Sequence, residues 1–385
     1  MPGKTAGEKL DGFEEAMEKR FRVGMVGLSA ERGWATAAHI PALRALSDVF
    51  ELAGVANTSL ASAQAAATAF DIPRAFENVA ELVASPDIDI VVVTVKVPYH
   101  RDVVAAALEA GKSVYCEWPL GNGLAEATEL AQLAKEKGVL AVAGTQAIAS
   151  PEVQFVRKLV AEGYVGDVLS STYISAGVTW GDEIQRGDSY AMDSRNGATL
   201  LSVIGGHAIA AVQCVLGPIR EVDAVLSQRR QTVRIAETGE YIPMNTPDHV
   251  LINAVLESGV PLSLQLRGGL PRGTGLRWEI NGTEGDLRIT AAFEYAPVVN
   301  ISALRVEGAR KGDDGYRELE IPRSSDLGLE DAVTARNVAE VYRLMAQDLR
   351  RRTRTAPDFE HALALHRTLD AVERSDETAR RVPVG

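Results

Sequence analysis

Cysteine, long apolar runs and basic charge are all scarce in this sequence, and each shortage excludes a class of protein. Only two cysteines, Cys116 and Cys214, occur among the 385 residues, which is too few for a disulfide framework or a cysteine-based metal site. No stretch approaches the roughly 20 apolar residues of a membrane helix. The polar first twenty residues lack the apolar core of a signal peptide. We therefore expect a cytoplasmic protein that binds neither a metal nor a membrane.

Acidic residues outnumber basic ones, which argues against a nucleic-acid partner. The 40 lysines and arginines are exceeded by 52 aspartates and glutamates, giving a net charge of −12 and an isoelectric point near 5.1. Proteins bind nucleic-acid phosphates through a basic face, and the one basic run, residues 350–354, is expected to be the solvated end of a helix. With 46% apolar residues, the chain can bury a core in each of two domains.

Residues 21–146 alternate between strand and helix patterns. Some strand candidates are continuous apolar runs such as Ile90–Val93, which is typical of strands buried on both faces. Gly111 and Gly138 follow two alanine-rich helices at C-cap positions. This repetition predicts a doubly wound parallel sheet. The expected strands are Phe21–Gly27, Phe50–Ala56, Ile88–Val95, Ser113–Cys116 and Val139–Ala143, and the expected helices are Ala37–Leu46, Leu60–Phe70, His100–Ala110 and Leu124–Lys137.

The pattern changes after Pro151. Successive strands with hairpin signals predict a mostly antiparallel sheet with helices on one side. We thus predict an α/β protein, with an N-terminal Rossmann domain and a C-terminal α+β domain with an open-faced sheet. The expected parts are an N-terminal extension (1–20), a dinucleotide-binding domain (21–147) and a substrate and oligomerisation domain (148–385). Its expected elements are helices Val153–Glu162, Ala198–Leu216, Glu330–Arg350 and Phe359–Arg374, strands Val168–Ala176, Asp248–Leu256, Leu262–Arg267, Trp278–Asn281 and Asp286–Ile289, and a loop, Gly177–Asn196.

A turn after the first strand carries the clearest functional signal. Dinucleotide-binding proteins have G-x-G-x-x-G here, because glycine lets the backbone approach a pyrophosphate at the helix N-terminus. Gly27 takes the first position, Ser29 takes the second, and Gly33 falls one residue after the third. Ser29 is small, and its hydroxyl can donate to a phosphate. The turn predicts a bound dinucleotide, with a tight turn that binds no ligand as the alternative.

The end of the second strand bears on the choice of cofactor. A carboxylate there would bind the 2′-hydroxyl of NAD, but this chain has Asn57, Thr58 and Ser59. NADP is therefore slightly favoured, with NAD still open. Arg32 is either a phosphate ligand or a solvated turn residue. The expected cofactor contacts are Gly27, Leu28, Ser29, Arg32, Trp34, Asn57, Thr94, Val95, His100, Glu117, Trp118 and Gln146.

Three further motifs resemble the glucose–fructose oxidoreductase, inositol dehydrogenase and MocA (Gfo/Idh/MocA) family. Glu117-Trp118-Pro119 stands where the family has Glu-Lys-Pro, and Gly205-Gly206-His207 stands where it has Asp-x-Gly-x-His. His100 matches the family's histidine after the fourth strand. The resemblance covers about residues 21–325 and is closest to the branch that contains the fungal galactose-pathway repressor. That branch is indicated by residues 27–30, 33–35, 117–118, 163–167 and 247–249.

The resemblance implies hydride transfer between a nicotinamide and a sugar or cyclic polyol. A histidine can take the hydroxyl proton near neutral pH, and His207 is the matching candidate, with a buried structural histidine as the alternative. Trp118 replaces the family's lysine, and Val203 replaces its aspartate. Because neither side chain can exchange a proton usefully, two of the family's three catalytic groups are missing.

Other polar side chains are candidates to compensate. Lys96 follows the fourth strand, at the sheet edge where such folds bind ligands, and is either a second catalytic group or a lysine whose head reaches solvent. Tyr190, Asp193 and Trp180 are the expected substrate contacts, with Trp180 either stacking on a sugar or anchoring its loop. We expect structural roles for His39 and His249, and surface or interface positions for His361 and His366.

Three functions remain open, and one of them is an enzyme that uses bound NAD(P) in a non-redox or self-recycling way. An NAD(P)-dependent oxidoreductase acting on CH–OH groups, with His207 and Lys96 as catalytic residues, is favoured because the family is mainly enzymatic. A non-catalytic NAD(P)-binding regulator with a protein partner, like the fungal repressor, is favoured by Trp118 and Val203. In each case the resemblance implies a homodimer or homotetramer formed through the C-terminal sheet.

Overall fold

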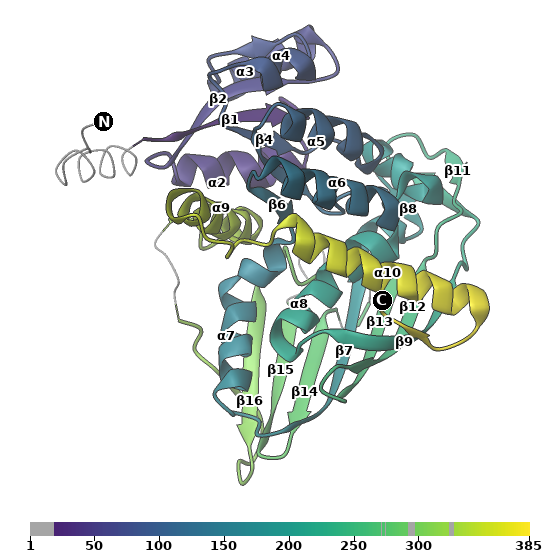
Figure 1. The fold of residues 1–385 in the computed structure, drawn as a ribbon. Helices are drawn as coiled ribbons and strands as arrows, with labels where there is room; N and C mark the ends of the chain where they lie inside the picture. Colours follow the sequence, from purple (N-terminus) through teal and green to yellow (C-terminus); the bar gives the residue numbers. More distant parts are fainter. Residues whose placement is uncertain (1–18, 271, 274, 292–296, 323–326) are drawn as a thin grey trace, which may run out of the picture. The chain divides into compact units, whose positions relative to one another are not determined.

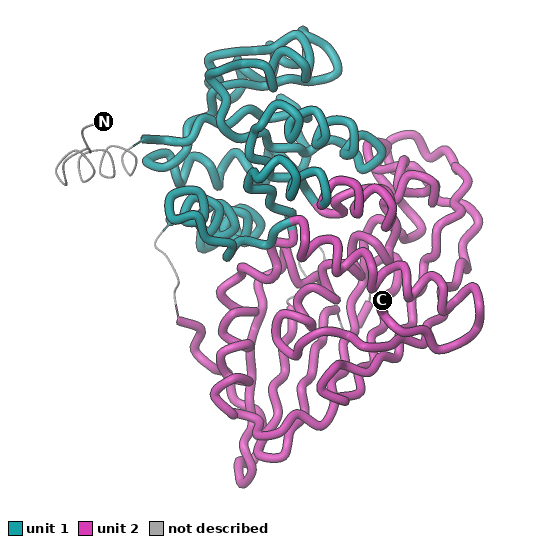
Figure 2. Tube along the Cα trace, in the orientation of Figure 1, with its two compact units in different colours: residues 1–117, 132–144, 327–358 teal, residues 118–131, 145–326, 359–385 magenta. Residues whose placement is uncertain are grey.

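The computed structural model describes residues 19–270, 272–273, 275–291, 297–322 and 327–385. The predicted N-terminal extension lies outside these residues apart from its last two. The chain divides into two compact units, shown in Figure 2. The first runs up to Glu117 and also includes Gln132–Gly144 and Leu327–Asp358. The second consists of Trp118–Ala131, Thr145–Asp326 and Phe359–Gly385.

The described part of the first unit contains a six-stranded parallel sheet with the order β3-β2-β1-β4-β5-β6 (Figure 1). All four residues of Ile90–Val93 are buried, as the apolar run predicts. The strand order reverses beside β1, which is the usual place for a dinucleotide in a doubly wound sheet. The Rossmann prediction is confirmed. The strands are β1 (Phe21–Val26), β2 (Phe50–Ala56), β3 (Ala75–Phe76), β4 (Ile90–Val93), β5 (Ser113–Glu117) and β6 (Ala141–Gly144).

The helices predicted for the dinucleotide-binding domain occur in the expected order. The expected first helix begins as a π-helical turn, η1, before α2. The short elements β3 and α4 carry too few residues for a periodic pattern and were not predicted. The helical segments are η1 (Ala35–His39), α2 (Ile40–Ala45), α3 (Leu60–Phe70), α4 (Val79–Ala84), η2 (Val97–Tyr99), α5 (His100–Glu109) and α9 (Val333–Arg351), while α6 (Leu124–Lys137) is divided between the units.

Helix α9 belongs to the first unit, whereas the sequence prediction placed every residue from 148 onward in the second domain. It packs against η1 and α2. The ring of Tyr342 lies 5.3 Å from that of Phe50 and 4.9 Å from that of Tyr115, distances at which aromatic pairs are attractive. The apolar face of α9 signals burial in the sequence, but its pattern does not say which sheet it covers.

The second unit is built on a nine-stranded sheet in the described residues, with the order β17-β16-β15-β14-β7-β13-β12-β9-β18. Only the β7–β13 pair is parallel, so the prediction of a mostly antiparallel sheet is confirmed. Side chains alternate: Val250 and Ile252 of β12 are buried, whereas Leu251 and Asn253 are exposed. The strands are β7 (Val168–Gly177), β9 (Ile219–Ser227), β12 (His249–Leu256), β13 (Pro261–Gly268), β14 (Arg277–Gly282), β15 (Gly285–Ala291), β16 (Leu304–Arg310), β17 (Arg317–Glu318) and β18 (Val382–Pro383).

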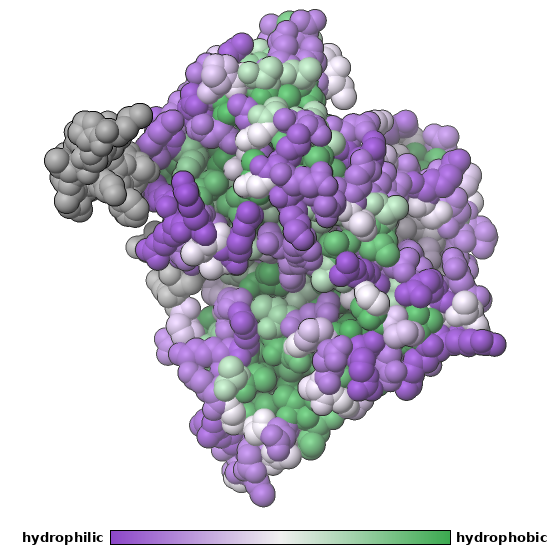
Figure 3. Space-filling view, in the orientation of Figure 1, coloured by the Kyte–Doolittle hydropathy of each residue, from purple (hydrophilic) through white to green (hydrophobic). Residues whose placement is uncertain are grey.

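Helices cover one face of this sheet, and Figure 3 shows hydrophobic surface on the side that carries α7 and α8. The predicted loop Gly177–Asn196 contains three short 3₁₀ turns and one strand of a second, three-stranded sheet. The remaining elements are η3 (Gln146–Ala149), α7 (Pro151–Ala161), η4 (Val178–Trp180), β8 (Glu183–Ile184), η5 (Arg186–Met192), η6 (Ser194–Asn196), η7 (Leu200–Gly205), α8 (Gly206–Leu216), β10 (Thr232–Ile235), β11 (Tyr241–Pro243) and α10 (Phe359–Thr378).

Candidate functional site

The predicted phosphate turn connects β1 to η1 in the first unit. Gly27 has φ = +100°, and a Cβ atom there would lie 2.8 Å from Cγ1 and 2.9 Å from the backbone nitrogen of Val95. Gly33 has φ = +132° and faces open space. Both positions therefore require glycine. Ser29 is exposed, and its oxygen accepts weak contacts from the backbone nitrogens of Glu31 and Arg32 at 3.4 and 3.5 Å.

Two buried polar atoms near this turn have no hydrogen-bond partner among the described residues, Nε1 of Trp34 and Oδ1 of Asn57. The Nδ2 of Asn57 donates to the carbonyls of Leu28 and Ser62 at 2.8 and 3.1 Å, so this side chain ties the turn to α3. Buried polar groups are normally paired. An indole N–H without an acceptor beside a glycine turn fits an oxygen of a phosphate or ribose. The residues present here therefore fit a dinucleotide.

The loop after β4 is held to the phosphate turn. The hydroxyl of Thr94 donates to the carbonyl of Val26 at 3.1 Å, and Val95 packs against Gly27. Lys96 is exposed at the carboxyl end of the strand, the edge at which doubly wound sheets bind ligands. The predicted catalytic residue Lys96 thus lies at the edge of the first-unit sheet where a bound ligand is expected.

His100, the first residue of α5, contacts the same loop. Its ring is buried, with Nε2 lying 2.9 Å from the carbonyl of Val95 and Nδ1 lying 3.5 Å from Sγ of Cys116. Nε2 donates to the carbonyl in this arrangement, so Nδ1 carries no proton. The Cys116 thiol beside it donates to the carbonyl of Glu117 at 3.4 Å. Burial raises the pKa of Cys116 well above its ordinary value, so the thiol keeps its proton. The His100 ring therefore supports the loop that carries Lys96, and its contact with a cofactor remains a prediction.

Glu117 ends β5 inside a buried polar network. Its Oε1 lies 2.9 Å from Nε2 of His39, whose Nδ1 lies 2.7 Å from the hydroxyl of Tyr342. Burial raises the pKa of Tyr342 well above its ordinary value, so the phenol donates to Nδ1 and the other ring nitrogen donates to Glu117. A Cβ at residue 144 would lie 2.7 Å from the Glu117 carboxylate, so Gly144 leaves it room.

Trp118, the first residue of the second unit, stands where the family has lysine. Its indole is 6% exposed, and its Nε1 donates to the carbonyl of Ser202 at 2.8 Å. The Trp118–Pro119 peptide is cis. A Cβ at Gly206 would overlap Nε1 and lie 2.6 Å from Cε2 of the indole. The lack of a side chain at Gly206 therefore lets the indole lie close to the backbone directly before His207.

His207 lies in the first turn of α8 and is 4% exposed. Burial lowers its pKa from 6.5 to about 3, so the imidazole is neutral throughout the physiological range. Its Nδ1 has no hydrogen-bond partner among the described residues. The ring is therefore a desolvated polar group that lacks a contact at one nitrogen.

Gln146 and His366 also carry polar atoms without described partners. Gln146 is fully buried, and neither its Nε2 nor its Oε1 is paired in the described part of the chain. Its segment, η3, packs against α8. A surface or interface position was expected for His366 of α10, but its side chain is only 3% exposed and its ring lies 4.8 Å from that of Trp118 within the second unit. Burial lowers its pKa from 6.5 to about 4.

The predicted substrate loop has its side chains largely engaged. Trp180 is 3% exposed and packs against Gly177 and Gly268, which fits loop anchoring. Burial and the nearby Asp188 raise the pKa of Tyr190. The carboxylate of Asp193 pairs with Arg195 at 2.6 Å, and the hydrogen bonds from Arg195 lower the pKa of that carboxyl to about 2. Direct contact of these three side chains with a substrate remains a prediction.

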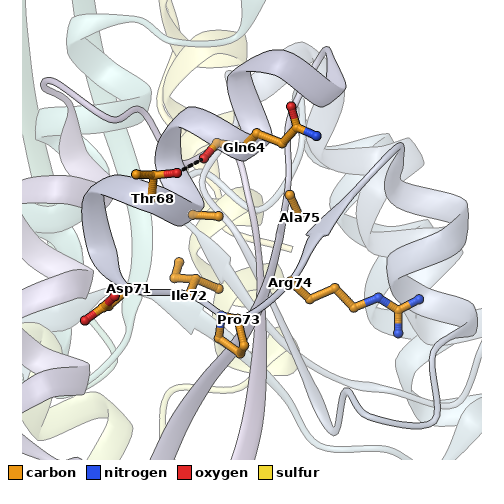
Figure 4. A pocket seen from close by; sticks show the side chains of 8 residues that line it. Gln64, Thr68, Asp71, Ile72, Pro73, Arg74 and Ala75 are labelled. Atoms are coloured by element: carbon orange, nitrogen blue, oxygen red, sulfur yellow. Dashed lines mark hydrogen bonds between the residues drawn. The ribbon is translucent and has the colours of Figure 1, made fainter.

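A pocket of about 550 Å³ lies elsewhere in the first unit, between the end of α3 and the start of β3 (Figure 4). In the figure, Arg74 and Asp71 point away from each other, and Thr68 bonds back to the carbonyl of Gln64. The pocket adjoins the amino end of a parallel strand, opposite the edge at which such sheets bind dinucleotides. It is therefore separate from the candidate site. Among the described residues, no group of metal-binding side chains comes together, and no helix is long and apolar enough to cross a bilayer.

Sequence reasoning missed two features around the candidate residues. One is the contact of Trp118 with Ser202 and Gly206, and the other is the approach of His366 to the indole. A tryptophan in place of the lysine and a glycine directly before His207 were both visible in the sequence. Only the fold shows that the glycine, Gly206, makes room for the indole of Trp118.

Two family models match the chain. One, described as the oxidoreductase family with an NAD-binding Rossmann fold, matches residues 21–145, and the other, described as the Gal80p C-terminal domain, matches residues 151–291. The first match supports the phosphate turn and the parallel sheet. The second supports the predicted repressor-like branch.

Individual proteins similar to the chain include both regulators and dehydrogenases. The galactose/lactose metabolism regulatory protein GAL80 of Kluyveromyces lactis is 30% identical over 313 residues, which cover 76% of this chain and 68% of that protein. The dehydrogenase aclE of Aspergillus oryzae is 31% identical over 284 residues, which cover 71% and 77%. The crystal structure of a super-repressor mutant of Gal80p from Saccharomyces cerevisiae matches with a TM-score of 0.86 and 25% identity, covering 95% of this chain and 98% of that one.

Proposed function

The chain belongs to the Gfo/Idh/MocA family of oxidoreductases, and on this premise we propose that it is an NAD(P)-dependent oxidoreductase acting on a sugar or cyclic polyol. The observation that carries the proposal is the state of His207. Its ring is buried and neutral, and its Nδ1 has no partner among the described residues. A desolvated nitrogen of this kind at the family's histidine position is expected to contact a ligand.

The low pKa of His207 specifies how it would act. A neutral imidazole donates one N–H and accepts at its other nitrogen, and a histidine with a depressed pKa can polarise a carbonyl as a neutral donor. We therefore assign His207 to hold the reacting oxygen. The nicotinamide, when bound, supplies or accepts the hydride.

Lys96 is the proposed second catalytic group. It is exposed at the carboxyl end of β4, and an ammonium can stabilise negative charge that develops on a reacting oxygen. This role would compensate for the lysine that Trp118 replaces. Replacing Lys96 by Met keeps the aliphatic stem and removes the charge, so the proposal expects turnover to fall while nucleotide binding persists. Unchanged turnover would remove Lys96 from the mechanism.

NADP is the proposed cofactor, with a slight preference over NAD. Asn57 carries no charge, and its Nδ2 is used by the carbonyls of Leu28 and Ser62, so no carboxylate at this position repels a 2′-phosphate. Arg32 is exposed in the phosphate turn between Gly27 and Gly33. Isothermal titration with each nucleotide tests the preference. Asn57→Asp should weaken NADP more than NAD, and equal weakening of both would contradict the assignment.

Turnover assays test the oxidoreductase directly. The full chain is incubated with NADP(H) or NAD(H) and a panel of sugars, polyols and their keto forms, and the absorbance of the reduced nicotinamide is followed. The proposal expects turnover of at least one compound, and its loss in His207→Ala with the nucleotide still bound. Arg374→Ala is a matched surface control, because its ion pair with Asp370 lies on the exposed side of α10.

A non-catalytic NAD(P)-binding regulator is the second candidate, and Trp118 is the observation that favours it. The indole is buried and its N–H is occupied by Ser202, so the position of the family's lysine can provide no proton. The similarity to the GAL80 regulatory protein spans most of the chain. Bound nucleotide without turnover of any compound, together with a specific co-purifying protein, would favour this candidate over the enzyme.

We further propose that the protein is cytoplasmic and forms a homodimer or homotetramer through the second-unit sheet. Exposed Val225 and Leu251 occur on neighbouring strands β9 and β12 and are directly paired in the sheet. Apolar side chains on an open sheet face are typical of an interface. Light scattering on Leu251→Glu should show a smaller particle than the wild type, and an unchanged mass would place any interface elsewhere.

A further inference from the structure

Trp118, which stands where the family has lysine, contacts the segment that leads to His207. The Trp118 indole donates to the carbonyl of Ser202 at 2.8 Å. Ser202 lies in η7, the π-helical turn that leads directly into α8 and His207. Turns of this type are rare and are frequent at functional sites. Trp118 therefore contacts the segment that presents the imidazole.

Ser202 is held from two directions. The hydroxyl of Thr199 accepts from the Ser202 backbone nitrogen at 3.0 Å, and the Ser202 hydroxyl accepts from the Thr199 nitrogen at 2.8 Å. The same hydroxyl donates to the carbonyl of Gly197 at 2.7 Å. This capping arrangement fixes the start of η7, while the indole fixes a carbonyl on the way to His207.

Gly206 makes the indole contact possible. A Cβ atom there would overlap Nε1 of Trp118 and lie 2.6 Å from both Cε2 and Cζ2. The indole is a rigid bicycle and is only 6% exposed, so it has little room to move away. Trp118 and Gly206 therefore depend on each other, and Gly206 is the residue directly before His207.

We propose that Trp118 is a positioning residue for His207, fixing η7 through Ser202 and lying against Gly206 so that the imidazole has one orientation. This inference rests on the proposed function of His207 and adds the residue that places it. The ring of His366, 4.8 Å from the indole, also packs against Trp118. A lysine in the same position would leave the Ser202 carbonyl without this planar donor and would not fill the space beside Gly206.

The test replaces Trp118 by Phe in the full chain, which removes the N–H and keeps an aromatic ring. The ring resonances of His207 are followed by NMR through a pH titration, with His207→Gln used for their assignment. The expected result is a changed chemical shift for His207 and a pKa raised above about 3 toward its ordinary value, because the loosened turn admits water. In turnover assays, kcat should fall by about tenfold or more, the factor that corresponds to the loss of one hydrogen bond of about 1.4 kcal/mol. KM should change less.

Trp278→Phe is the matched control. Trp278 is fully buried and donates from Nε1 to the hydroxyl of Ser171 at 3.0 Å, but it lies in β14, and its hydrogen bond goes to β7 and not to η7. This variant should leave the titration of His207 unchanged. A shift of His207 as large as in Trp118→Phe would show a general effect of losing a buried indole and would overturn the proposal.

A second variant keeps the test decisive if Trp118→Phe fails to fold. Gly206→Ala should also change the chemical shift and the pKa of His207, because its methyl group would clash with the indole. Trp118→Phe removes the indole, so the double variant should shift His207 no further than Gly206→Ala does. A folded Trp118→Phe or Gly206→Ala with the wild-type titration of His207 would overturn the proposal. The NMR readout does not require turnover, so an inactive wild type whose His207 responds to Trp118 would reject the proposed function and retain the positioning role.

Discussion

His39 and Glu117 form a buried pair at the end of β5, with Nε2 of the imidazole 2.9 Å from Oε1 of the carboxylate. The other ring nitrogen of His39 is occupied by Tyr342 at 2.7 Å. Nε2 donates to a carboxylate, and the loss of a hydrogen bond to such a group costs about 1.5–3 kcal/mol. His39→Leu should therefore lower the free energy of unfolding by that order, as measured by urea denaturation.

Tyr342→Phe is a milder change to the same network, and its loss of stability is compared with that of His39→Leu. It removes a single neutral hydrogen bond and keeps the ring that packs on Phe50 and Tyr115. A loss of about 1 kcal/mol is expected. Equal losses in Tyr342→Phe and His39→Leu would show that packing, and not the hydrogen bond from His39 to the Glu117 carboxylate, accounts for the effect.

Gly27→Ala tests the phosphate turn. The positive φ and the approach of Val95 leave no room for a methyl group, so the turn must shift and nucleotide affinity should fall by more than about tenfold. Gly111→Ala is the control, since Gly111 also has a positive φ (+71°) but faces open space at the end of α5. It should cost about 1 kcal/mol of stability and leave the Kd for NADP unchanged. Titration calorimetry on both variants gives the comparison.

Acid should destabilise the protein through its buried histidines. The pKa of His207 is lowered to about 3 and that of His366 to about 4, in both cases by burial, from an ordinary value of 6.5. The unfolded chain therefore binds more protons below pH 6.5. The stability that these neutral rings provide is complete above pH 6.5 and is lost as the pH falls toward 4 and 3, by up to about 1.4 kcal/mol per pH unit for each ring.

His366→Phe isolates one of these contributions. Urea unfolding near pH 7 and near pH 5 should show a smaller difference for the variant than for the wild type, because one buried ring no longer has to stay neutral. The same difference in both proteins would mean that His366 contributes nothing to the acid sensitivity.

Asp348 provides a purely structural prediction. It is 2% exposed, and its carboxylate accepts from the backbone nitrogens of Thr355 and Ala356 at 2.8 Å and from the hydroxyl of Thr353 at 2.6 Å. Burial alone would raise its pKa, but these hydrogen bonds lower it overall. Asp348→Ala leaves two backbone donors unpaired and should cost about 2–4 kcal/mol. A loss below that of Gly111→Ala would contradict this account of the loop.

The sequence was sufficient for those parts of the fold with strong local signals. The strand Ile88–Val95 and the helix Leu60–Phe70 were predictable from a β-branched run and an alanine-rich pattern. The helix occurs at those bounds, and the strand is shorter, Ile90–Val93. The π-helical turn η7 was not, because hydrophobic periodicity does not distinguish it from the start of α8. The assignment of α9 to the first unit depends on contacts of Tyr342 with residues some 300 positions earlier, which no local pattern reports.

The candidate site was predictable as residue types but not as contacts. Trp118, Val203 and His207 could be named from the motif, and Lys96 from its place after β4. The occupation of the Trp118 N–H by Ser202 and the depressed pKa of His207 arise from burial in the folded unit. Both features depend on which side chains the fold brings together, which the spacing along the chain does not give.

The central claim is that His207 takes part in hydride transfer and does not merely support α8. The most direct measurement is single-turnover oxidation of bound reduced cofactor by a keto sugar that the wild type accepts, compared with His207→Asn, each with its nucleotide Kd determined first. The account predicts equal nucleotide affinity and a rate of hydride transfer reduced by about a hundredfold or more, the usual scale for the loss of one donor that stabilises charge on a reacting oxygen. An unchanged rate in His207→Asn at full occupancy would contradict it.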